Sequence, residues 1–467
     1  MRNNSNKVVL NSALVVVGFV FNKAITFLMI PIFTRMLTTS DYGKVSTYTA
    51  WMAILAYIVG MALEYSVRNA YVDFHEDMNK YMSSICSLSL VGLFVIGGFV
   101  LGLNELFFHQ MNLMLSVCCI IHAYVHSLIN YINMVLTMKE QYVKRVLLLL
   151  LPNLLSSILG IVFIANMASD KYMGRVLGYI IVFLPLGVWL LYHEFKIGKT
   201  FYQQKYWMYA LTISLPMVAH GLSNVVLNHF DRILLSTMRS DSEAGIYSLV
   251  YNFSMISIAI TTAMENIWIP WFTKKIVAKQ HTLINRMAKL YVYLIVAIIC
   301  GILMVAPEFL MLMSSKEYWS GKIIIVPIVI SSYVIFLYSL QVAEEIYYKT
   351  SKITAINTFI AAVFNFVTDC MVIPQYGMLG AAYTTLASYI ISFILHYRYG
   401  RKLNKALFPF SVYFVPSIIV IIMGVISYVE MDNWIIRWSL AILIATACLV
   451  GFLNKDKIID KFIYTDN

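Results

Sequence analysis

Charged side chains lie inside long apolar stretches of this 467-residue chain, and Lys23 is the most deeply placed of them, within the segment 20–25. An ionisable group near the centre of a bilayer costs about 2.5–3.5 kcal/mol on insertion scales, so it normally faces a cavity or a partner. Lys23 is therefore a candidate binding residue. The alternative is a lysine whose charge is satisfied by neighbouring backbone carbonyls.

A stripe of polar residues follows later in the chain. His220, Asn224, Asn228 and Asp231 are separated by steps of four, four and three residues. A helix places such residues on one face. In lipid this face must point toward water or another helix, so contact with a ligand and hydrogen bonding between helices both stay open.

Other buried polar residues have simpler interpretations. Packing between helices is the stronger explanation for a second stripe, formed by Asn357, Asn365 and Asp369. Glu344 and Glu345 lie close to the end of an apolar stretch, where Lys349 and Lys352 can neutralise them.

The elements that carry these residues are membrane spans. The chain is 60% hydrophobic and 12% charged, whereas soluble domains are about 25% charged. A span needs about 20 apolar residues, and stretches this continuous are too long for barrel strands. We predict an all-α membrane protein of about fourteen transmembrane helices. The expected spans are 9–33, 45–66, 84–104, 111–136, 146–167, 174–192, 207–236, 246–271, 290–313, 323–347, 353–373, 379–396, 411–429 and 434–453.

The net charge of +11 is distributed as in a membrane protein and not as in a nucleic-acid-binding protein. With a cytoplasmic N-terminus, cytoplasmic connections and termini carry 24 Lys and Arg, and the opposite side carries 8. This is the positive-inside bias. We expect a multi-pass protein of the bacterial cell (inner) membrane with both termini in the cytoplasm.

A weak internal repeat divides the spans. Arg35 and Arg232 are 197 residues apart, whereas Gly43 and Gly245 are 202 apart, as are Gly178 and Gly380. Six spans separate the repeats, so the two halves run in the same direction. We predict two pseudo-symmetric six-helix lobes, 1–205 and 206–405, followed by a helix pair and cytoplasmic tail at 406–467. The 197-residue offset also relates Lys23 to His220.

Motifs of common enzymes are missing from the sequence. It has no Gly-rich phosphate loop ending in Lys-Ser/Thr, no metal-spaced His/Cys set and no Ser nucleophile elbow. The connections are too short for the large loop that a membrane glycosyltransferase or ligase needs. We therefore expect a transporter without a cofactor, and not an enzyme.

The chain resembles the Wzx-type polysaccharide flippases of the multidrug/oligosaccharidyl-lipid/polysaccharide exporter superfamily. Matching pieces occur in order along the whole chain, at 31–37 (Pro-Ile-Phe-Thr-Arg-Met-Leu), 41–43, 231–232, 243–247, 306–310, 373–377 and 380–382. The resemblance implies two lobes around a central cavity that opens alternately to each side. It also implies the substrate, an oligosaccharide repeat unit on undecaprenyl diphosphate, which is moved from the cytoplasmic to the outer leaflet for O-antigen, capsule or exopolysaccharide synthesis.

In this resemblance the diphosphate and sugar would contact the cavity-lining residues Lys23, Arg35, His220, Asn224, Asn228, Asp231 and Arg232. The expected partners are the lipid-linked oligosaccharide and membrane lipids, with a polysaccharide polymerase and a chain-length regulator as further candidates. The candidate coupling ions are H⁺ and Na⁺, and no nucleic acid is expected. The alternatives are a drug/cation antiporter or a peptidoglycan-precursor flippase of the same superfamily, and, from another class, a membrane-embedded glycosyltransferase or ligase.

The charge distribution generates a topology prediction. With reporters fused after Asn467, we expect a fluorescent protein to be active and a phosphatase to be inactive. An even number of spans returns the chain to the cytoplasmic side on which it began. Paired phosphatase and fluorescent-protein fusions measure this. A periplasmic signal would contradict both the orientation and the even count.

Overall fold

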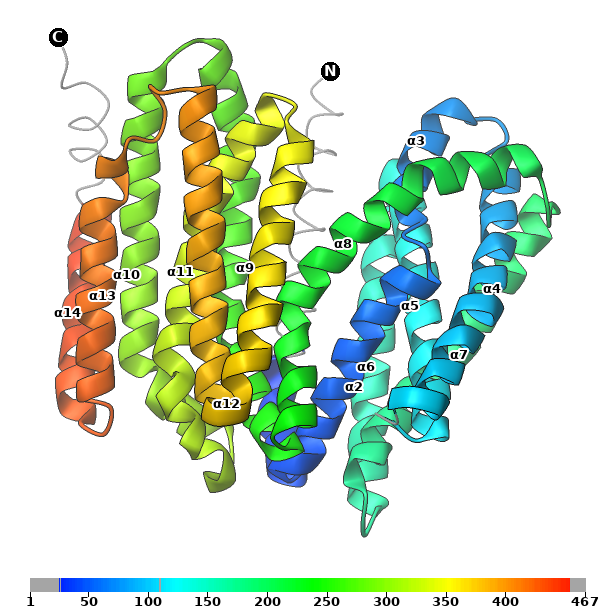
Figure 1. Cartoon of the computed structure of the whole chain (residues 1–467), viewed down its shortest axis with the longest axis horizontal. Coiled ribbons are helices and arrows are strands. Elements are labelled where there is room, and N and C mark those ends of the chain that lie inside the picture. Colours follow the sequence, from blue (N-terminus) through cyan, green and yellow to red (C-terminus); the bar gives the residue numbers. More distant parts are fainter. Residues whose placement is uncertain (1–24, 26, 109–110, 454–467) are drawn as a thin grey trace. The chain divides into compact units, whose positions relative to one another are not determined.

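The computed structural model describes residues 25, 27–108 and 111–453. Regular structure in these residues is helical without any strand, which confirms the predicted all-α membrane fold. Packing divides the chain into two compact units, residues 1–245 (unit 1) and 246–467 (unit 2), which are described separately (Figure 1).

Unit 1 is a bundle of long helices that run back and forth (Figure 1). Its core lies where α3, α4, α5, α7 and the first turns of α8 meet, around the buried side chains of Leu63, Tyr81 and Tyr131. The helices are α2 (Thr39–Val59), α3 (Glu64–Asp73), α4 (Met78–Leu103), α5 (Leu113–Met138), α6 (Tyr142–Asn166), α7 (Lys171–Gly198) and α8 (Gln204–Met238), with a short π-helix at Asn104–Phe108 after α4.

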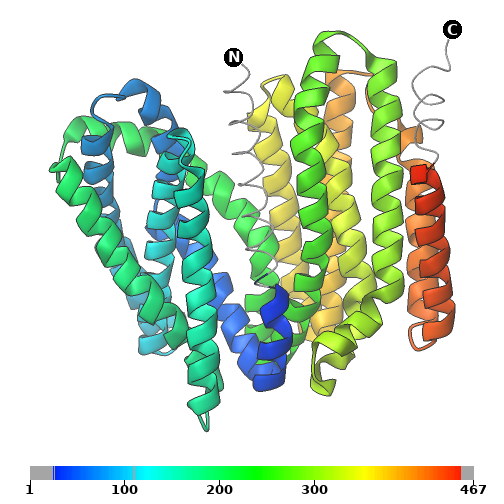
Figure 2. The ribbon, with the colours of Figure 1, turned by 180° about the vertical axis from the view of Figure 1, so that it is seen from behind.

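Unit 2 begins within α9 and also consists of long helices that run side by side (Figure 2). Helices α13 and α14 pack on α10 at one side of this unit. The helices are α9 (Asp241–Val277), α10 (His281–Met313), α11 (Ile325–Tyr347), α12 (Ser351–Leu403), α13 (Phe414–Val429) and α14 (Trp434–Leu453), with 3₁₀ helices at Lys316–Ile324 and Phe410–Val412.

The helices agree with the predicted spans. Within the described residues, 11 helices are long and apolar enough to cross a membrane, and the bent α8 makes 12. Helix α12 has 53 residues and is broken at Gly377, whose backbone has φ 56° and ψ −139°, so it covers the two predicted spans 353–373 and 379–396. Most of the first predicted span, 9–33, lies outside the described residues. The lobe boundaries proposed from the repeat stay a prediction.

The predicted span 45–66 lies within one candidate membrane span, Thr39–Asp73, but its helix is interrupted. The helix breaks between α2 and α3, where Met61 and Ala62 have left-handed backbones with φ of 51° and 49°. The Tyr131 hydroxyl of α5 donates a hydrogen bond to the carbonyl of Gly60 and so satisfies a backbone group freed by the break. Hydropathy does not detect the break, because the residues around it are apolar and well packed.

The starts of α2 and α9 touch through two glycines. A Cβ atom at Gly43 would lie 1.7 Å from the backbone oxygen of Asp241, and one at Gly245 would lie 2.1 Å from the backbone oxygen of Thr39. The offset of 202 residues relates Gly43 to Gly245 and also Thr39 to Asp241. The contact therefore joins equivalent positions in both directions, and it leaves no room for a side chain.

The same offset relates the N-terminal caps of these two helices. The Thr38 hydroxyl accepts a hydrogen bond from the backbone N–H of Asp41 at 3.1 Å. The Ser240 hydroxyl accepts one from the N–H of Glu243 at 3.2 Å. Both caps satisfy a backbone donor that the first helical turn leaves free.

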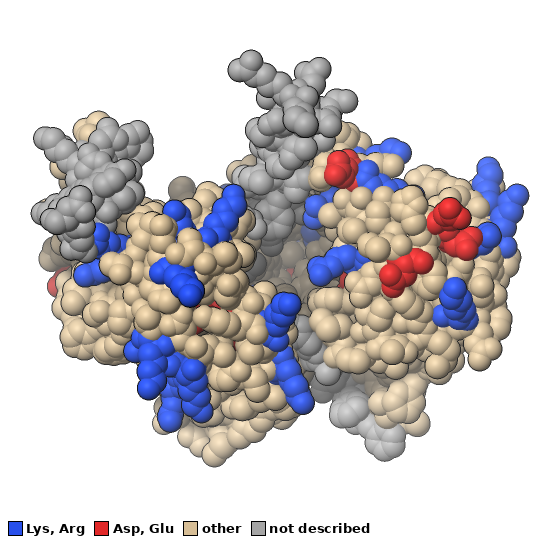
Figure 3. All heavy atoms as spheres, turned by 90° about the horizontal axis from the view of Figure 1, so that it is seen from above, with Lys and Arg blue, Asp and Glu red and all other residues tan. Residues whose placement is uncertain are grey.

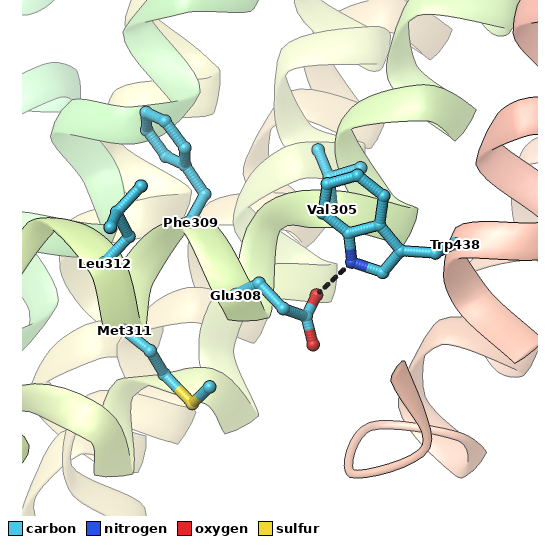
Figure 4. A pocket seen from close by; sticks show the side chains of 6 residues that line it. All are labelled: Val305, Glu308, Phe309, Met311, Leu312 and Trp438. Atoms are coloured by element: carbon cyan, nitrogen blue, oxygen red, sulfur yellow. Dashed lines mark hydrogen bonds between the residues drawn. The ribbon is translucent and has the colours of Figure 1, made fainter. Parts of the chain in front are cut away.

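A buried ion pair joins α14 to α10. Arg437 is 1% exposed, and its guanidinium binds both carboxylate oxygens of Glu308 while donating to the carbonyls of Met304 and Glu430 at 2.9 and 3.0 Å. The Trp438 indole N–H also donates to Glu308, across a mainly apolar pocket (Figure 4). A bidentate, fully hydrogen-bonded pair of this kind fixes geometry more than a single contact does.

The glycine contact generates a stability prediction. Gly43→Ala or Gly245→Ala should lower the free energy of unfolding by about 1–3 kcal/mol, because the added methyl group overlaps a backbone oxygen and forces α2 and α9 apart. The midpoint of thermal unfolding of the purified protein in detergent measures the effect.

Gly301→Ala is the matched control, since a Cβ atom there would meet nothing within 4 Å. It should leave the midpoint unchanged or raise it slightly, because alanine favours a helix. Equal midpoints for all three variants would show that the contact does not hold the two helices together.

Candidate functional site

The predicted site residues are only partly described by the structure. Lys23 lies outside the described residues, so its role stays a prediction. Arg35 is exposed, near the end of the short apolar helix Phe27–Met36. The other five candidates all lie on α8.

Helix α8 bends where its polar stripe passes. The segments Gln204–Ser223 and Val225–Met238 meet at an angle of 49°. In many transporters, discontinuous helices of this kind lie at the binding site, because the bend exposes backbone groups to a cavity. Asn224 lies at this bend and His220 one turn before it, their side chains are outside the description, and their role as site residues stays a prediction.

Asp231 and Arg232 lie deep in the interface between α8 and α2. They are 3% and 6% exposed, and the Arg232 guanidinium lies 3.1 Å from Nδ1 of His229. The Thr47 hydroxyl of α2 donates to the carbonyl of Arg232 at 3.5 Å. Because a guanidinium only donates, Nδ1 of His229 is the acceptor in this contact. Asn228, one residue before His229, is half-buried.

A further cation in unit 1, Arg175 of α7, was missed by the sequence analysis, which counted it with a connection. Its guanidinium lies over the rings of Tyr179 and Phe33, 4.2 and 4.5 Å from their centroids. It donates to the Ser156 carbonyl at 2.8 Å and to the Ser157 hydroxyl at 3.3 Å. No carboxylate among the described residues forms an ion pair with it.

Glycines bring α7 close enough to α6 for these contacts. A Cβ atom at Gly178 would lie 2.7 Å from the backbone nitrogen of Gly160, and one at Gly160 would lie 3.1 Å from the Arg175 side chain. The spacing of Gly174 and Gly178 around Arg175 is the signal in the sequence that could have identified it. The two glycines flank a half-buried positive charge at the close approach of α6 and α7.

Aromatic rings line the same part of unit 1. The Tyr48 hydroxyl lies 3.4 Å from Nδ1 of His122, and the His122 ring stacks on Tyr179 with centroids 4.8 Å apart. Tyr48 and His122 are 0% and 2% exposed. The guanidinium of Arg175 lies over the ring of Tyr179, so the cation and the three rings form one cluster.

The second polar stripe is buried along the first arm of α12, and its last member contacts the second arm. Asn357, Asn365 and Asp369 are 8%, 2% and 0% exposed. The Thr384 hydroxyl of the second arm donates to the Asp369 carboxylate of the first. Hydrogen bonds of this kind stabilise helix pairs in lipid.

The side-chain partner of Glu345 is His396, 51 residues away in sequence, and not one of the nearby lysines as expected. Both side chains are fully buried, with Nδ1 of His396 2.9 Å from the Glu345 carboxylate. Local spacing could not reveal this partner, because only the fold brings α11 and α12 together. For Glu344 the expectation stays a prediction.

Basic side chains cluster at one end of each unit. Figure 3 shows Lys and Arg on the face seen from above, where the connections after α5, α7, α9, α11 and α12 lie. These connections contain Lys139, Lys199, Lys279, Lys349 and Lys405. Basic side chains are thus present on this face of both units.

Comparisons with known proteins agree with this architecture. Protein 1 of the Lsg locus of Haemophilus influenzae is 23% identical over 80% of this chain and 95% of its own length. Capsular polysaccharide biosynthesis protein CapF of Staphylococcus aureus is 21% identical over 81% of this chain and 95% of its own length.

Solved structures show the same fold. The lipid II flippase MurJ in an inward closed conformation matches with a TM-score of 0.73 and 14% identity, over 96% of this chain and 100% of that protein. An inward-facing multidrug transporter of the MATE family matches with a TM-score of 0.60 and 14% identity, over 82% of this chain and 96% of that protein.

The family model described as polysaccharide biosynthesis protein matches residues 8–276, more than half of the chain. The chain therefore belongs to the polysaccharide biosynthesis protein family, as a Wzx-type member of the multidrug/oligosaccharidyl-lipid/polysaccharide exporter superfamily.

Proposed function

We propose that the protein moves undecaprenyl-diphosphate-linked oligosaccharide repeat units from the cytoplasmic to the outer leaflet by alternating access. The observation that carries this proposal is the match of residues 8–276 to the polysaccharide family in a chain with a transporter fold. Polysaccharide precursors made on a lipid have to cross the membrane before they are assembled at the surface. A membrane-embedded bundle with short connections suits that step.

The short connections also favour transport over catalysis. Among the described residues, the connections between spans hold only short helices, such as α3, and no separate domain. A glycosyltransferase or ligase needs a place outside the membrane to bind and activate its sugar donor. This chain offers no such place in its described part, so a catalytic role has less support.

The diphosphate determines what the site must contain. Two phosphate charges entering a low-dielectric space need cations and hydrogen-bond donors to replace lost water. Lys23, Arg35 and Arg232 were predicted to supply them, with His220 contributing when protonated. Arg175 is a further candidate, because its charge lies among the helices of unit 1 and forms no ion pair with a carboxylate of the described residues.

The two rival substrates are a drug with a counter-ion and a peptidoglycan precursor. The multidrug transporter and the lipid II flippase share this fold at 14% identity, which leaves the cargo open. The family match favours a polysaccharide precursor. In this proposal the protein lies in the bacterial inner membrane, and the basic end shown in Figure 3 faces the cytoplasm.

Lys23→Glu should abolish function while the protein still inserts. Reversing the charge replaces attraction of the diphosphate by repulsion, and a charge-assisted hydrogen bond is worth roughly 1.5–3 kcal/mol, so surface polysaccharide should fall about tenfold or more. The measurement is surface polysaccharide in a deletion strain that expresses the variant, together with its amount in the membrane.

Two variants serve as controls. Lys23→Arg keeps the charge and should retain most of the polymer. Lys405→Glu makes the same charge change at an exposed position after α12 and should behave as wild type. Normal polymer with a stably inserted Lys23→Glu protein would rule out contact between Lys23 and the diphosphate.

A further inference from the structure

The turn between α9 and α10 carries a dense group of positive charges. Lys274 and Lys279 are exposed there, whereas Lys275 and Lys289 are half-buried. None of these four side chains forms an ion pair with a carboxylate of the described residues. This group, named the basic hairpin, takes no part in the site proposed for the diphosphate.

The backbone of the turn is fixed by its own hydrogen bonds. Lys279 has a left-handed backbone with φ 57°, and the N–H of Gln280 donates to the carbonyl of Lys275 at 3.1 Å. Beneath the turn, the rings of Trp268 of α9 and Tyr291 of α10 pack with their centroids 5.2 Å apart. The four lysines are therefore held on one short helical hairpin and not on a long loop.

No exposed acid accompanies these lysines in the described part of unit 2. At this end of the unit, the carboxylates are those of Glu344 and Glu345, which are 1% and 0% exposed. The equivalent end of unit 1 is mixed, since Asp73, Glu76 and Glu140 are exposed among its lysines, and Figure 3 shows red side chains on its surface. Both ends carry many lysines and arginines, so the positive-inside bias does not explain why one of them lacks exposed acids.

Exposed apolar side chains and rings lie at the same level as the lysines and just below them. Along α9 the order is Ile267, Trp271 and Lys274, and Ile267 is 67% exposed. Val277, between the lysines, is also 67% exposed, and Leu294 of α10 is 49% exposed. Apolar residues followed by tryptophan and then lysine is the order expected from the hydrocarbon to the headgroups of a bilayer. This order favours a lipid over a soluble acidic protein as the partner of the charges.

We propose that the basic hairpin binds the phosphate groups of anionic phospholipids in the adjoining leaflet, while Val277 enters the boundary between headgroups and acyl chains. Ammonium groups donate charge-assisted hydrogen bonds to phosphate oxygens. Each lysine close to an anionic membrane surface strengthens binding about fivefold, so four of them together select anionic over neutral lipid. This binding does not rest on the transport function proposed above.

Lipid retention by the purified full-length protein tests the proposal. The protein is reconstituted with equal parts of phosphatidylglycerol and phosphatidylcholine and extracted in mild detergent, and mass spectrometry then counts the bound lipids. The wild type should retain phosphatidylglycerol over phosphatidylcholine by about tenfold or more. A variant with glutamine at all four positions of the basic hairpin should lose most of this preference. An unchanged preference in that variant would overturn the proposal.

The matched control makes the same change at four exposed lysines of unit 1. They lie at the corresponding end of that unit, at Lys139, Lys144, Lys196 and Lys199. This variant loses the same net charge and should keep the wild-type preference, because exposed acids already offset the charge of that surface. An equal loss of preference in both variants would show that only net charge matters and would contradict a site on the basic hairpin.

Single substitutions keep the proposal testable if the fourfold variant fails to fold. Lys279 and Lys199 are both exposed and have the same left-handed backbone, with φ of 57° and 49°. Lys279→Gln should reduce the preference for phosphatidylglycerol about fivefold, whereas Lys199→Gln should leave it near the wild-type value. A loss for Lys199→Gln as large as that for Lys279→Gln would argue against the assignment.

A soluble polyglutamate peptide tests the alternative partner. Phosphatidylglycerol should stay bound to the wild type in the presence of the peptide, because the peptide offers nothing to the exposed apolar side chains beside the lysines. Displacement of the lipid by the peptide at a concentration below that of the lipid would assign the basic hairpin to an acidic protein and overturn the lipid proposal.

Discussion

Hydrocarbon offers no partner to a polar group, so each polar group in a span has to be satisfied by the protein itself. This constraint explains the main contacts of the structure. Arg437 donates hydrogen bonds to both carboxylate oxygens of Glu308 and to two backbone carbonyls. These bonds join α14 to α10. At the break between α2 and α3, the Gly60 carbonyl accepts a hydrogen bond from the Tyr131 hydroxyl of α5. Polar side chains thus determine which apolar helices become neighbours.

The repeat adds a second level of order. Thr38 and Ser240 cap equivalent helices in the same way, and Gly43 and Gly245 meet in a symmetric contact. Both contacts agree with the parallel repeat that the 202-residue offset predicts. The absence of side chains at the contact allows the two helix starts to approach to backbone distance.

Hydropathy and charge predicted the helices and most of their ends, because length and apolar content are local properties of the sequence. The break after α2 and the Glu345–His396 pair were not predictable in this way. The residues around the break are apolar like those of an unbroken span, and the pair joins residues 51 positions apart. For the predicted site, the sequence indicated the polar face of α8, and the structure adds its bend and the burial of Asp231 and Arg232. Arg175 went unnoticed because its partners are backbone and aromatic groups.

The central claim is that this chain alone carries a sugar-bearing lipid across a bilayer. The most direct measurement uses purified protein in liposomes with a labelled undecaprenyl-diphosphate oligosaccharide and a reagent that reaches only the outer leaflet. The account predicts that the protected pool of labelled lipid becomes accessible much faster with the protein than in empty liposomes, and that lipid II competes poorly. Equal rates with and without the protein would contradict the account.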